Sequence, residues 1–277
     1  MGQQFHLSFE FYPPNSQRGE NNLMRSATRL NGEQPDFFSV TYGAGGSTRT
    51  GTKQTVESLL KENWPAVPHL SWGHTTRKHV VQQIQEYCDL GVKALVLLRG
   101  DAPSGTVPGI THHASELVEL VRSEFNDQFE IFVAAYPETH PDAPNPSRDI
   151  QYLRQKVDAG ANACFTQYFY NSDAYFFFVD QCRRQGVDAP IIPGIMPITN
   201  YDRLVRFSRN CGAEIPQWIE RKLFEFKEDQ QALEDFGCEV VLALCQRLCD
   251  NGCPGLHFYT LNRARATQRI LKDLAVS

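Results

Sequence analysis

One acidic residue, Glu10, has the surroundings of a catalytic group. It lies between Phe9 and Phe11 in the run Leu7–Tyr12, which is otherwise mostly apolar. Removing a carboxyl group from water disfavours its charged form and raises its pKa. A carboxyl group with a raised pKa can serve as a general acid near neutral pH. A structural ion pair with a nearby Arg or Lys is the alternative interpretation of the same residue.

A second candidate is the tripeptide Arg99-Gly100-Asp101, which combines a cation, a glycine and an anion. Arg99 is suited to holding a phosphate, and Asp101 can accept hydrogen bonds from a heterocycle. A solvated turn with a surface ion pair is the alternative. The glycine-rich run at residues 43–46 would let a ligand approach the backbone, but it is no Gly-x-Gly-x-x-Gly fingerprint and no Walker A motif occurs. A Rossmann or P-loop nucleotide site is therefore unsupported.

Metal-binding patterns are weak in this chain. Cys238, Cys245, Cys249 and Cys253 fall on one stripe of an expected helix, but none of them forms a Cys-x-x-Cys pair, and no His-Glu-x-x-His motif occurs. Free cysteine packs as a small hydrophobe, and disulfides are rare in a reducing cytoplasm. We therefore interpret all 8 cysteines as packing residues and expect no bound metal.

Eight β-rich runs recur along the chain and would position these residues. The first seven begin 27–37 residues apart, which is the spacing of one strand, one helix and their loops in a parallel sheet. The expected strands are Leu7–Tyr12, Phe37–Tyr42, Val67–Trp72, Ala94–Arg99, Ile131–Tyr136, Ala163–Phe169, Ile191–Met196 and Leu256–Thr260.

Helical patterns fill the intervals between these strands. Lys78–Leu90 places Val81, Ile84, Tyr87 and Cys88 on one face of a helix. The other expected helices are Ser115–Phe125, Asp149–Ala159 and Glu228–Asp250.

This alternation predicts a (β/α)₈ TIM barrel, with extra helices between the seventh and eighth strands and a single catalytic domain over residues 1–277. A doubly wound parallel sheet is the structural alternative. On a barrel of this kind, active sites form at the carboxyl ends of the strands. Glu10, Arg99 and Gln167 all lie near the ends of expected strands.

Composition excludes several classes of protein. Hydrophobic residues make up 41% of the 277 residues, charged residues make up 21%, and the net charge is −5. These values are typical of a globular protein and argue against a disordered or fibrous chain. The acidic balance argues against broad nucleic-acid binding, and no apolar run approaches the ~20 residues of a membrane span. Without a visible secretory signal, we expect a cytoplasmic protein that binds neither nucleic acid nor membrane.

A set of motifs lies at residues 8–14, 39–44, 98–101, 134–138, 156–161, 166–167, 192–197 and 257–263. Taken in chain order, this set resembles the bacterial 5,10-methylenetetrahydrofolate reductase family. The resemblance implies a barrel that contains FAD, takes electrons from NADH or NADPH, and reduces 5,10-methylenetetrahydrofolate to 5-methyltetrahydrofolate for methionine synthesis. The two substrates would take turns over one flavin in a ping-pong mechanism.

The resemblance also implies roles for individual residues. The catalytic residues would be Glu10, as the general acid that protonates the bridging nitrogen of the folate, and Asp101, beside flavin and pterin. The implied substrate-binding residues are Gln167, Arg203, Phe207, Arg263 and Thr41. The implied flavin-binding residues are Thr41, Tyr42, Ala44, His69, Arg99, Gly100, Asp101, Ala114, Tyr136, His140, Asp149 and Lys156.

The chain departs from the family pattern at three positions. Arg203 stands where a substrate-contacting glutamine is expected, and Gln155 and Tyr152 stand where flavin-binding Arg and Asn are common. These departures leave open a flavin-free reductase, or one fed electrons by a partner protein. A catalytically silent folate- or flavin-binding subunit is the alternative from another class.

The family resemblance further leads us to expect a homo-oligomer without the C-terminal regulatory domain of eukaryotic relatives. The aromatic run Tyr175–Phe178 could supply an apolar contact patch, or it could belong to a helix core.

Overall fold

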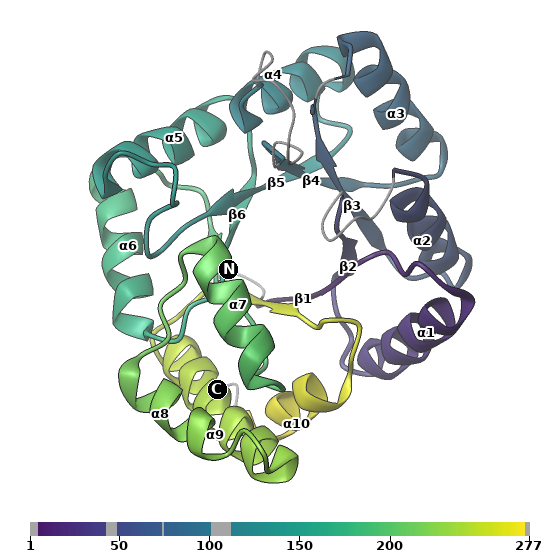
Figure 1. The fold of residues 1–277 in the computed structure, drawn as a ribbon. Coiled ribbons are helices and arrows are strands. Elements are labelled where there is room, and N and C mark those ends of the chain that lie inside the picture. Colours follow the sequence, from purple (N-terminus) through teal and green to yellow (C-terminus); the bar gives the residue numbers. More distant parts are fainter. Residues whose placement is uncertain (1–4, 43–48, 74, 101–111, 275–277) are drawn as a thin grey trace.

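In the computed structural model, a parallel β-sheet closes into a ring and the helices lie outside it (Figure 1). The structure describes residues 5–42, 49–73, 75–100 and 112–274. The strands are β1 (His6–Phe11), β2 (Phe37–Val40), β3 (Ala66–Ser71), β4 (Ala94–Leu98), β5 (Glu130–Ala135), β6 (Ala163–Thr166), β7 (Ile191–Ile192), β8 (Gly194–Ile195) and β9 (Gly255–Tyr259). The helices are α1 (Gln17–Asn31), α2 (Arg49–Lys61), α3 (Arg77–Asp89), α4 (Ala114–Phe125), α5 (Pro146–Asp158), α6 (Ser172–Arg184), α7 (Tyr201–Cys211), α8 (Gln217–Glu225), α9 (Gln230–Asp250) and α10 (Arg265–Asp273).

Strand order confirms the predicted (β/α)₈ barrel and excludes the doubly wound sheet. The sheet order is β7-β6-β5-β4-β3-β2-β1-β9-β8, and every pairing is parallel. β7 pairs with β6, while β8 pairs with β9, and only Pro193 separates the two short strands. Together they occupy one position in the ring and close it. The extra helices predicted between the last two strands are α7, α8 and α9.

Most of the expected strands are displaced by only one or two residues at an end, but two of them differ more. The expected strand Ile191–Met196 is divided at Pro193, because proline has no N–H to donate to a ladder. The carbonyl of Pro193 still accepts a hydrogen bond of 3.0 Å from His257 N. The expected strand Ala163–Phe169 ends at Thr166, where the chain leaves the sheet.

The helices begin near, but not always at, their expected residues. α5 starts at Pro146 rather than Asp149, since Asn145 caps it by accepting a hydrogen bond from Arg148 N. On α3 the buried residues are Val80, Ile84 and Tyr87. The predicted face is confirmed, because Ile84 and Tyr87 are buried, and Val81 and Cys88 are partly buried and pack against the core. Val80 is a further buried residue that the prediction did not include.

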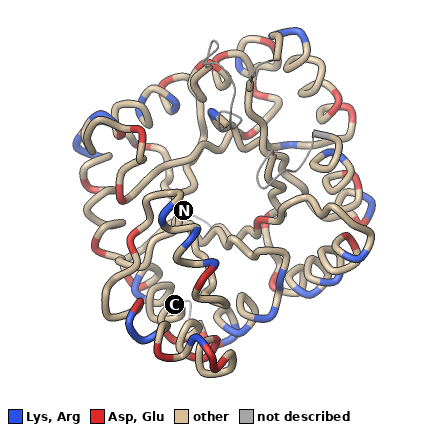
Figure 2. Tube along the Cα trace, in the orientation of Figure 1, with Lys and Arg blue, Asp and Glu red and all other residues tan. Residues whose placement is uncertain are grey.

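Two layers of apolar side chains stabilise the barrel. Inside the ring, one cluster joins Phe37, Phe132 and Phe165 with smaller residues from neighbouring strands. Outside it, a larger cluster fills the space between strands and helices. Figure 2 places most Lys, Arg, Asp and Glu residues on the helices around the ring. A carboxylate on the inner side of a strand, such as Glu10, is therefore an exception that calls for an explanation.

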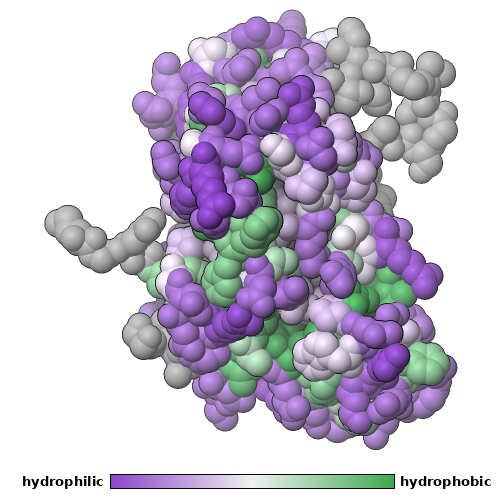
Figure 3. All heavy atoms as spheres, turned by 90° about the vertical axis from the view of Figure 1, so that its left-hand side faces the viewer, coloured by the Kyte–Doolittle hydropathy of each residue, from purple (hydrophilic) through white to green (hydrophobic). Residues whose placement is uncertain are grey.

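The cysteines and the aromatic run behave as packing residues for the most part. All 8 cysteines are free, and five of them are buried. Tyr175 and Phe178 belong to the core, whereas the side chain of Phe177 is 65% exposed. The face on the α5–α6 side is mainly hydrophilic, with hydrophobic residues visible between the polar ones (Figure 3).

Candidate functional site

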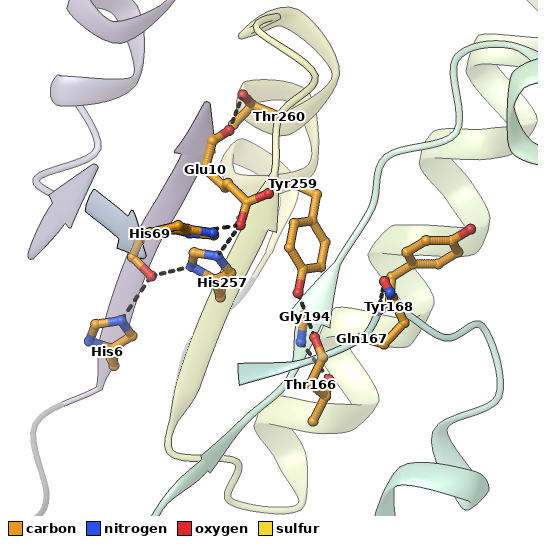
Figure 4. Close-up of polar contacts among 11 residues, drawn as sticks. His6, Glu10, His69, Thr166, Gln167, Tyr168, Gly194, His257, Tyr259 and Thr260 are labelled. Carbon is orange, nitrogen blue, oxygen red and sulfur yellow. Dashed lines mark hydrogen bonds and ion pairs between the residues drawn. The ribbon is translucent and has the colours of Figure 1, made fainter. Parts of the chain in front are cut away.

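Glu10 lies near the carboxyl end of β1 and points toward two histidines from neighbouring parts of the barrel (Figure 4). Its Oε2 atom is 3.4 Å from His69 Nε2 on β3 and 3.4 Å from His257 Nε2 on β9. The side chain of Glu10 is only 16% exposed. Thr260 fixes the backbone here, since its Oγ1 donates a hydrogen bond of 2.6 Å to the main-chain oxygen of Glu10. The structure therefore places this carboxyl group inside the ring, facing imidazoles rather than a surface Arg or Lys.

Burial controls the charge of these three groups. Desolvation raises the pKa of Glu10, and the nearby His69 opposes part of that rise. Burial also lowers the pKa of His69 to about 4 and that of His257 to about 3. Both imidazoles are consequently neutral at pH 7. The group beside them is a carboxyl whose protonated form is favoured, as a general acid requires.

Two buried polar atoms near these strand ends have no hydrogen-bond partner among the described residues. They are Thr41 Oγ1 and His69 Nε2. His69 Nε2 lies 3.4 Å from Glu10 Oε2, but this contact does not have the geometry of a hydrogen bond. Thr41 is held by its backbone, because its N–H donates to Phe11 O at 2.9 Å and its carbonyl accepts from Thr52 Oγ1 at 2.8 Å. Unpartnered buried polar atoms cost free energy. They are therefore available to a ligand that supplies hydrogen bonds at the ends of β2 and β3.

Next to Glu10 on the neighbouring strand, Tyr259 connects β9 with β6 (Figure 4). Its hydroxyl donates a hydrogen bond of 2.6 Å to Thr166 O. Gly194 makes room for this contact, because a Cβ atom there would lie 2.1 Å from Thr166 O and 2.6 Å from the Tyr259 ring. Gln167 follows directly, and its Oε1 accepts a hydrogen bond from Tyr168 N at 3.0 Å. This bond leaves the amide nitrogen of Gln167 for another partner.

A charged cluster lies where β4 and β5 leave the sheet. Arg99 forms an ion pair of 2.6 Å with Asp142, and His140 N donates to Asp149 Oδ2 at 2.8 Å. The rings of His140 and Tyr136 meet edge to face, with their centroids 4.5 Å apart. Burial, followed by the charge of Arg99, lowers the pKa of His140. The structure thus brings together four of the predicted flavin-binding residues.

Lys156 belongs to the surroundings of this cluster. It extends from α5 and donates a hydrogen bond to Ala134 O on β5. Burial lowers the pKa of its ammonium group, while its positive charge contributes to lowering the pKa of His140. Two cations near one strand end are suited to an anionic ligand such as a diphosphate.

Gly100 occupies a position that only glycine tolerates well. Its φ of +79° lies in the left-handed region, and a Cβ atom there would be 2.7 Å from Ser71 Oγ. The backbone after β4 can therefore pass close to the end of β3.

The remaining predicted residues are more dispersed. Tyr42 follows β2 and is partly buried, while Ala114 is the first residue of α4. Phe207 on α7 packs against the core, while Arg203 on the same helix is exposed. Arg263 is also exposed, four positions beyond the end of β9.

Among the described residues, no hydrogen bond or ion pair joins Glu10 to Arg203 or Arg263, and no ring contact brings Phe207 to the site. Gln155 and Tyr152, where the chain departs from the family pattern, are both exposed on α5. Ala44 and Asp101 lie outside the described residues, so their predicted roles remain predictions.

Sequence reasoning assigned no role to Ser8 or His257, although both belong to the site. Ser8 Oγ lies 2.7 Å from His257 Nδ1. The signal was present in the alternation of each strand, because residues two apart point to the same side. Ser8 and Glu10 share one side of β1, and His257 and Tyr259 share one side of β9.

Within the described residues, no group of three His, Cys, Asp or Glu side chains is arranged to hold a metal ion. Nor is any described helix both long enough and apolar enough to cross a membrane.

Comparisons with known proteins agree over nearly the whole chain. A family model described as methylenetetrahydrofolate reductase matches residues 2–275. The 5,10-methylenetetrahydrofolate reductase of Escherichia coli is 36% identical over 275 residues, which cover 99% of this chain and 92% of that protein. A probable methylenetetrahydrofolate reductase (NADH) of Oryza sativa is 35% identical over 287 residues, covering 98% of this chain and 48% of that protein.

Among solved structures, an uncharacterized protein from Clostridium thermocellum, which binds two copies of 5-methyl-5,6,7,8-tetrahydrofolic acid, has a TM-score of 0.68. It is 17% identical, and the match covers 98% of this chain and 94% of that one. At this identity the likeness concerns the fold alone.

Proposed function

Because the chain belongs to the methylenetetrahydrofolate reductase family, we propose that it reduces 5,10-methylenetetrahydrofolate to 5-methyltetrahydrofolate, using NADH or NADPH and a bound FAD. The observation that carries the proposal is the environment of Glu10. Its carboxyl group is desolvated inside the barrel and lies 3.4 Å from two imidazoles that burial keeps neutral. The relatives from Escherichia coli and Oryza sativa, which are 36% and 35% identical to this chain, support the substrate class.

The described residues fit a flavin at the strand ends. His69 Nε2 and Thr41 Oγ1 are buried without hydrogen-bond partners among the described residues, and a flavin ring offers both donors and acceptors to such atoms. Arg99 and Lys156 supply positive charge for a diphosphate. A bound diphosphate would compete with Asp142 for the guanidinium of Arg99, because Asp142 is held in an exposed ion pair. When bound, FAD would carry a hydride from reduced nicotinamide to the folate.

Glu10 is the residue that handles the proton in this proposal. Opening the five-membered ring of the folate requires a proton on its bridging nitrogen, and the protonated carboxyl of Glu10 would deliver it. Desolvation favours the protonated form, and the two neutral imidazoles do not compete with it as cations would. Glu10 would return to the carboxylate form at this step and need a new proton before the next turnover.

Other residues would bind and orient the substrates. The amide nitrogen of Gln167, which has no hydrogen bond among the described residues, can donate to a pterin, since its oxygen already accepts from Tyr168 N. Arg203 and Arg263, both exposed, suit the anionic glutamate tail of a folate. Asp101 is proposed to stabilise the positive charge that develops on the folate, and Phe207 to stack against a substrate ring.

The experiment that tests this function separates the two half-reactions. Purified protein reconstituted with FAD should be reduced anaerobically by NADH or NADPH, and then reoxidised by 5,10-methylenetetrahydrofolate. We expect Glu10→Gln to slow the folate half-reaction by about 10²–10⁴-fold, the usual contribution of a general acid, and to change the nicotinamide half-reaction little. Glu119→Gln, an exposed substitution on α4, is the matched control.

Three results would contradict the proposal in different ways. Protein that takes up no FAD would point to a flavin-free enzyme. FAD-containing protein that reduced nicotinamide leaves oxidised, but that a partner protein reduces, would indicate a different electron donor. Equal losses in both half-reactions of Glu10→Gln would refute the role of this residue.

A further inference from the structure

A line of polar groups runs through the barrel from Glu10 to the opposite end of β1. His257 Nε2 is 3.4 Å from Glu10 Oε2, and His257 Nδ1 is 2.7 Å from Ser8 Oγ. Ser8 Oγ is 2.8 Å from His6 Nε2, and His6 Nδ1 is 2.7 Å from Asp36 Oδ2. Asp36 directly precedes β2, and its side chain is 37% exposed. The line therefore begins at a buried acid and ends at solvent.

The geometry points to a proton relay: we propose that His6 and Asp36 take up protons at the amino-terminal end of the barrel and pass them through Ser8 and His257 to Glu10. This inference rests on the proposed function, in which Glu10 gives up one proton in each turnover. Folate and flavin at the strand ends would separate the carboxylate from solvent on that side. The relay would restore its proton from the other side.

The proton balance of the relay closes. A proton from solvent reaches His6 Nδ1 by way of Asp36, while His6 Nε2–H passes its proton to Ser8 Oγ. Ser8 passes its hydroxyl proton to His257 Nδ1, and His257 Nε2–H passes its own to the Glu10 carboxylate. One proton enters, one is delivered, and each group in between keeps its charge. Both imidazoles end in the other tautomer, so a half-turn of each ring, with rotation of the Ser8 hydroxyl, resets the line for the next proton.

Every intermediate group in the line can both donate and accept a proton. A hydroxyl does so in any state, and an imidazole does so only when neutral. Burial lowers the pKa of His6 to about 4 and that of His257 to about 3, against the opposing charge of Asp36 on His6. Glu10 faces His69 and His257, and His6 faces Asp36 and His257. At pH 7 both rings of the relay are thus neutral.

Apolar rings lie against both histidines of the line. The His6 ring lies 5.2 Å from Phe37 and 5.9 Å from Phe165, measured between centroids. His257 stacks on Phe165 at 4.1 Å. Polar groups placed among such side chains cost free energy. A barrel that only needed to be filled would be more stable with apolar residues at His6 and Ser8.

β9 holds His6, at the amino-terminal end of the relay, in place. His6 pairs with Gly255, and a Cβ atom at Gly255 would lie 2.2 Å from His6 O and 2.4 Å from His6 Cβ. His6 N also donates to Pro254 O at 3.0 Å. Asp36 is fixed in turn by Leu7 N, which donates to its Oδ2 at 3.1 Å.

The test uses the FAD-reconstituted protein with His6→Gln and Asp36→Asn. A glutamine amide can still donate to Ser8 but does not shuttle protons, so His6→Gln keeps the hydrogen bond and interrupts the relay. Because Glu10 must regain its proton after each folate reduction, we expect steady-state turnover of His6→Gln to slow at least tenfold, with a larger solvent deuterium isotope effect than in wild type. The nicotinamide half-reaction should stay within twofold. His79→Gln, on the exposed start of α3, should match wild type in both.

A second variant separates proton transfer from packing. In His6→Ala, added imidazole should restore steady-state turnover, and bases of different pKa should restore it in proportion to their ability to carry a proton. Wild-type turnover in both His6→Gln and Asp36→Asn, or a nicotinamide half-reaction slowed as much as turnover itself, would overturn the relay while leaving the proposed function intact. A wild-type protein without either half-reaction would instead refute the proposed function, and the relay with it.

Discussion

Replacing Glu138 with glutamine should make the protein more stable, and increasingly so as the pH rises. Glu138 follows β5, and its Oε2 accepts a hydrogen bond of 2.8 Å from Glu214 N in the segment between α7 and α8. Its other oxygen, Oε1, is buried without a hydrogen bond among the described residues. Burial raises the pKa of this carboxyl group from 4.5 to about 7, and the charge of Glu214 adds to the rise.

The sign and size of the effect follow from proton linkage. A carboxyl group with a raised pKa in the folded state stabilises the fold below its unfolded value of 4.5. That stability is lost as the pH rises through about 7. The full difference of about 2.5 pKa units would amount to about 3 kcal/mol. Because Glu138 is only partly buried, we expect about 1–2 kcal/mol after allowance for solvent screening.

Urea unfolding followed by tryptophan fluorescence at pH 5, 6, 7 and 8 measures this difference. The glutamine amide is neutral at every pH and keeps an acceptor for Glu214 N, so the stability of Glu138→Gln relative to wild type should grow from pH 5 to 8. The exposed substitution Glu119→Gln should show no such trend. A stability difference that stays constant over this range, or a variant less stable than wild type at pH 8, would refute the reasoning.

Two further predictions concern the barrel interior. Gly194→Ala should lower the unfolding free energy measured in urea by about 2–4 kcal/mol, because its Cβ would lie 2.1 Å from Thr166 O. The control Gly32→Ala, at an ordinary φ of −62°, should lower it by less than about 1 kcal/mol. Equal losses in the two variants would contradict the close-packing argument. Acidification should destabilise the protein below pH 6.5, since His69 and His257 have folded-state pKa values of about 4 and 3, and each contributes a slope of up to about 1.4 kcal/mol per pH unit. His257→Asn should flatten the fall in urea midpoint between pH 6 and 4, and an unchanged slope would argue against a neutral buried His257.

The barrel could be predicted because its signal is local and repeated. Runs such as Ala94–Leu98 are apolar and short, and the helices between them fill intervals of similar length. The division of the seventh strand could not be placed in the same way. Pro193 is visible in the sequence, but only closure of the ring decides that β7 pairs with β6 and β8 with β9. The start of α5 was a missed local signal, since Asn145-Pro146 is a typical cap and first residue of a helix.

In the candidate site too, the local signals could be predicted from the sequence and the long-range contacts could not. Glu10 could be found from sequence because its neighbours in the chain are apolar and its own chemistry differs from theirs. Its partners could not, because Ser8 and His257 are 249 positions apart and meet only through the register that pairs β1 with β9. His6 gave no signal of its own, since a histidine at the start of a strand is ordinary until its ring is found 2.8 Å from Ser8.

The distribution of polarity inside the barrel bears on whether the protein is an enzyme or a silent binding subunit. Phe37, Phe132 and Phe165 fill one part of the interior as a stabilising core would require. Beside them, His257 is buried and the side chain of Glu10 is only partly exposed, at positions where apolar residues of similar size would stabilise the fold more. A binding subunit needs polar atoms that face its ligand, but it has no use for a continuous polar line from that ligand to the far end of the barrel. Proton transfer accounts for the line over its whole length, and this favours a catalytic barrel.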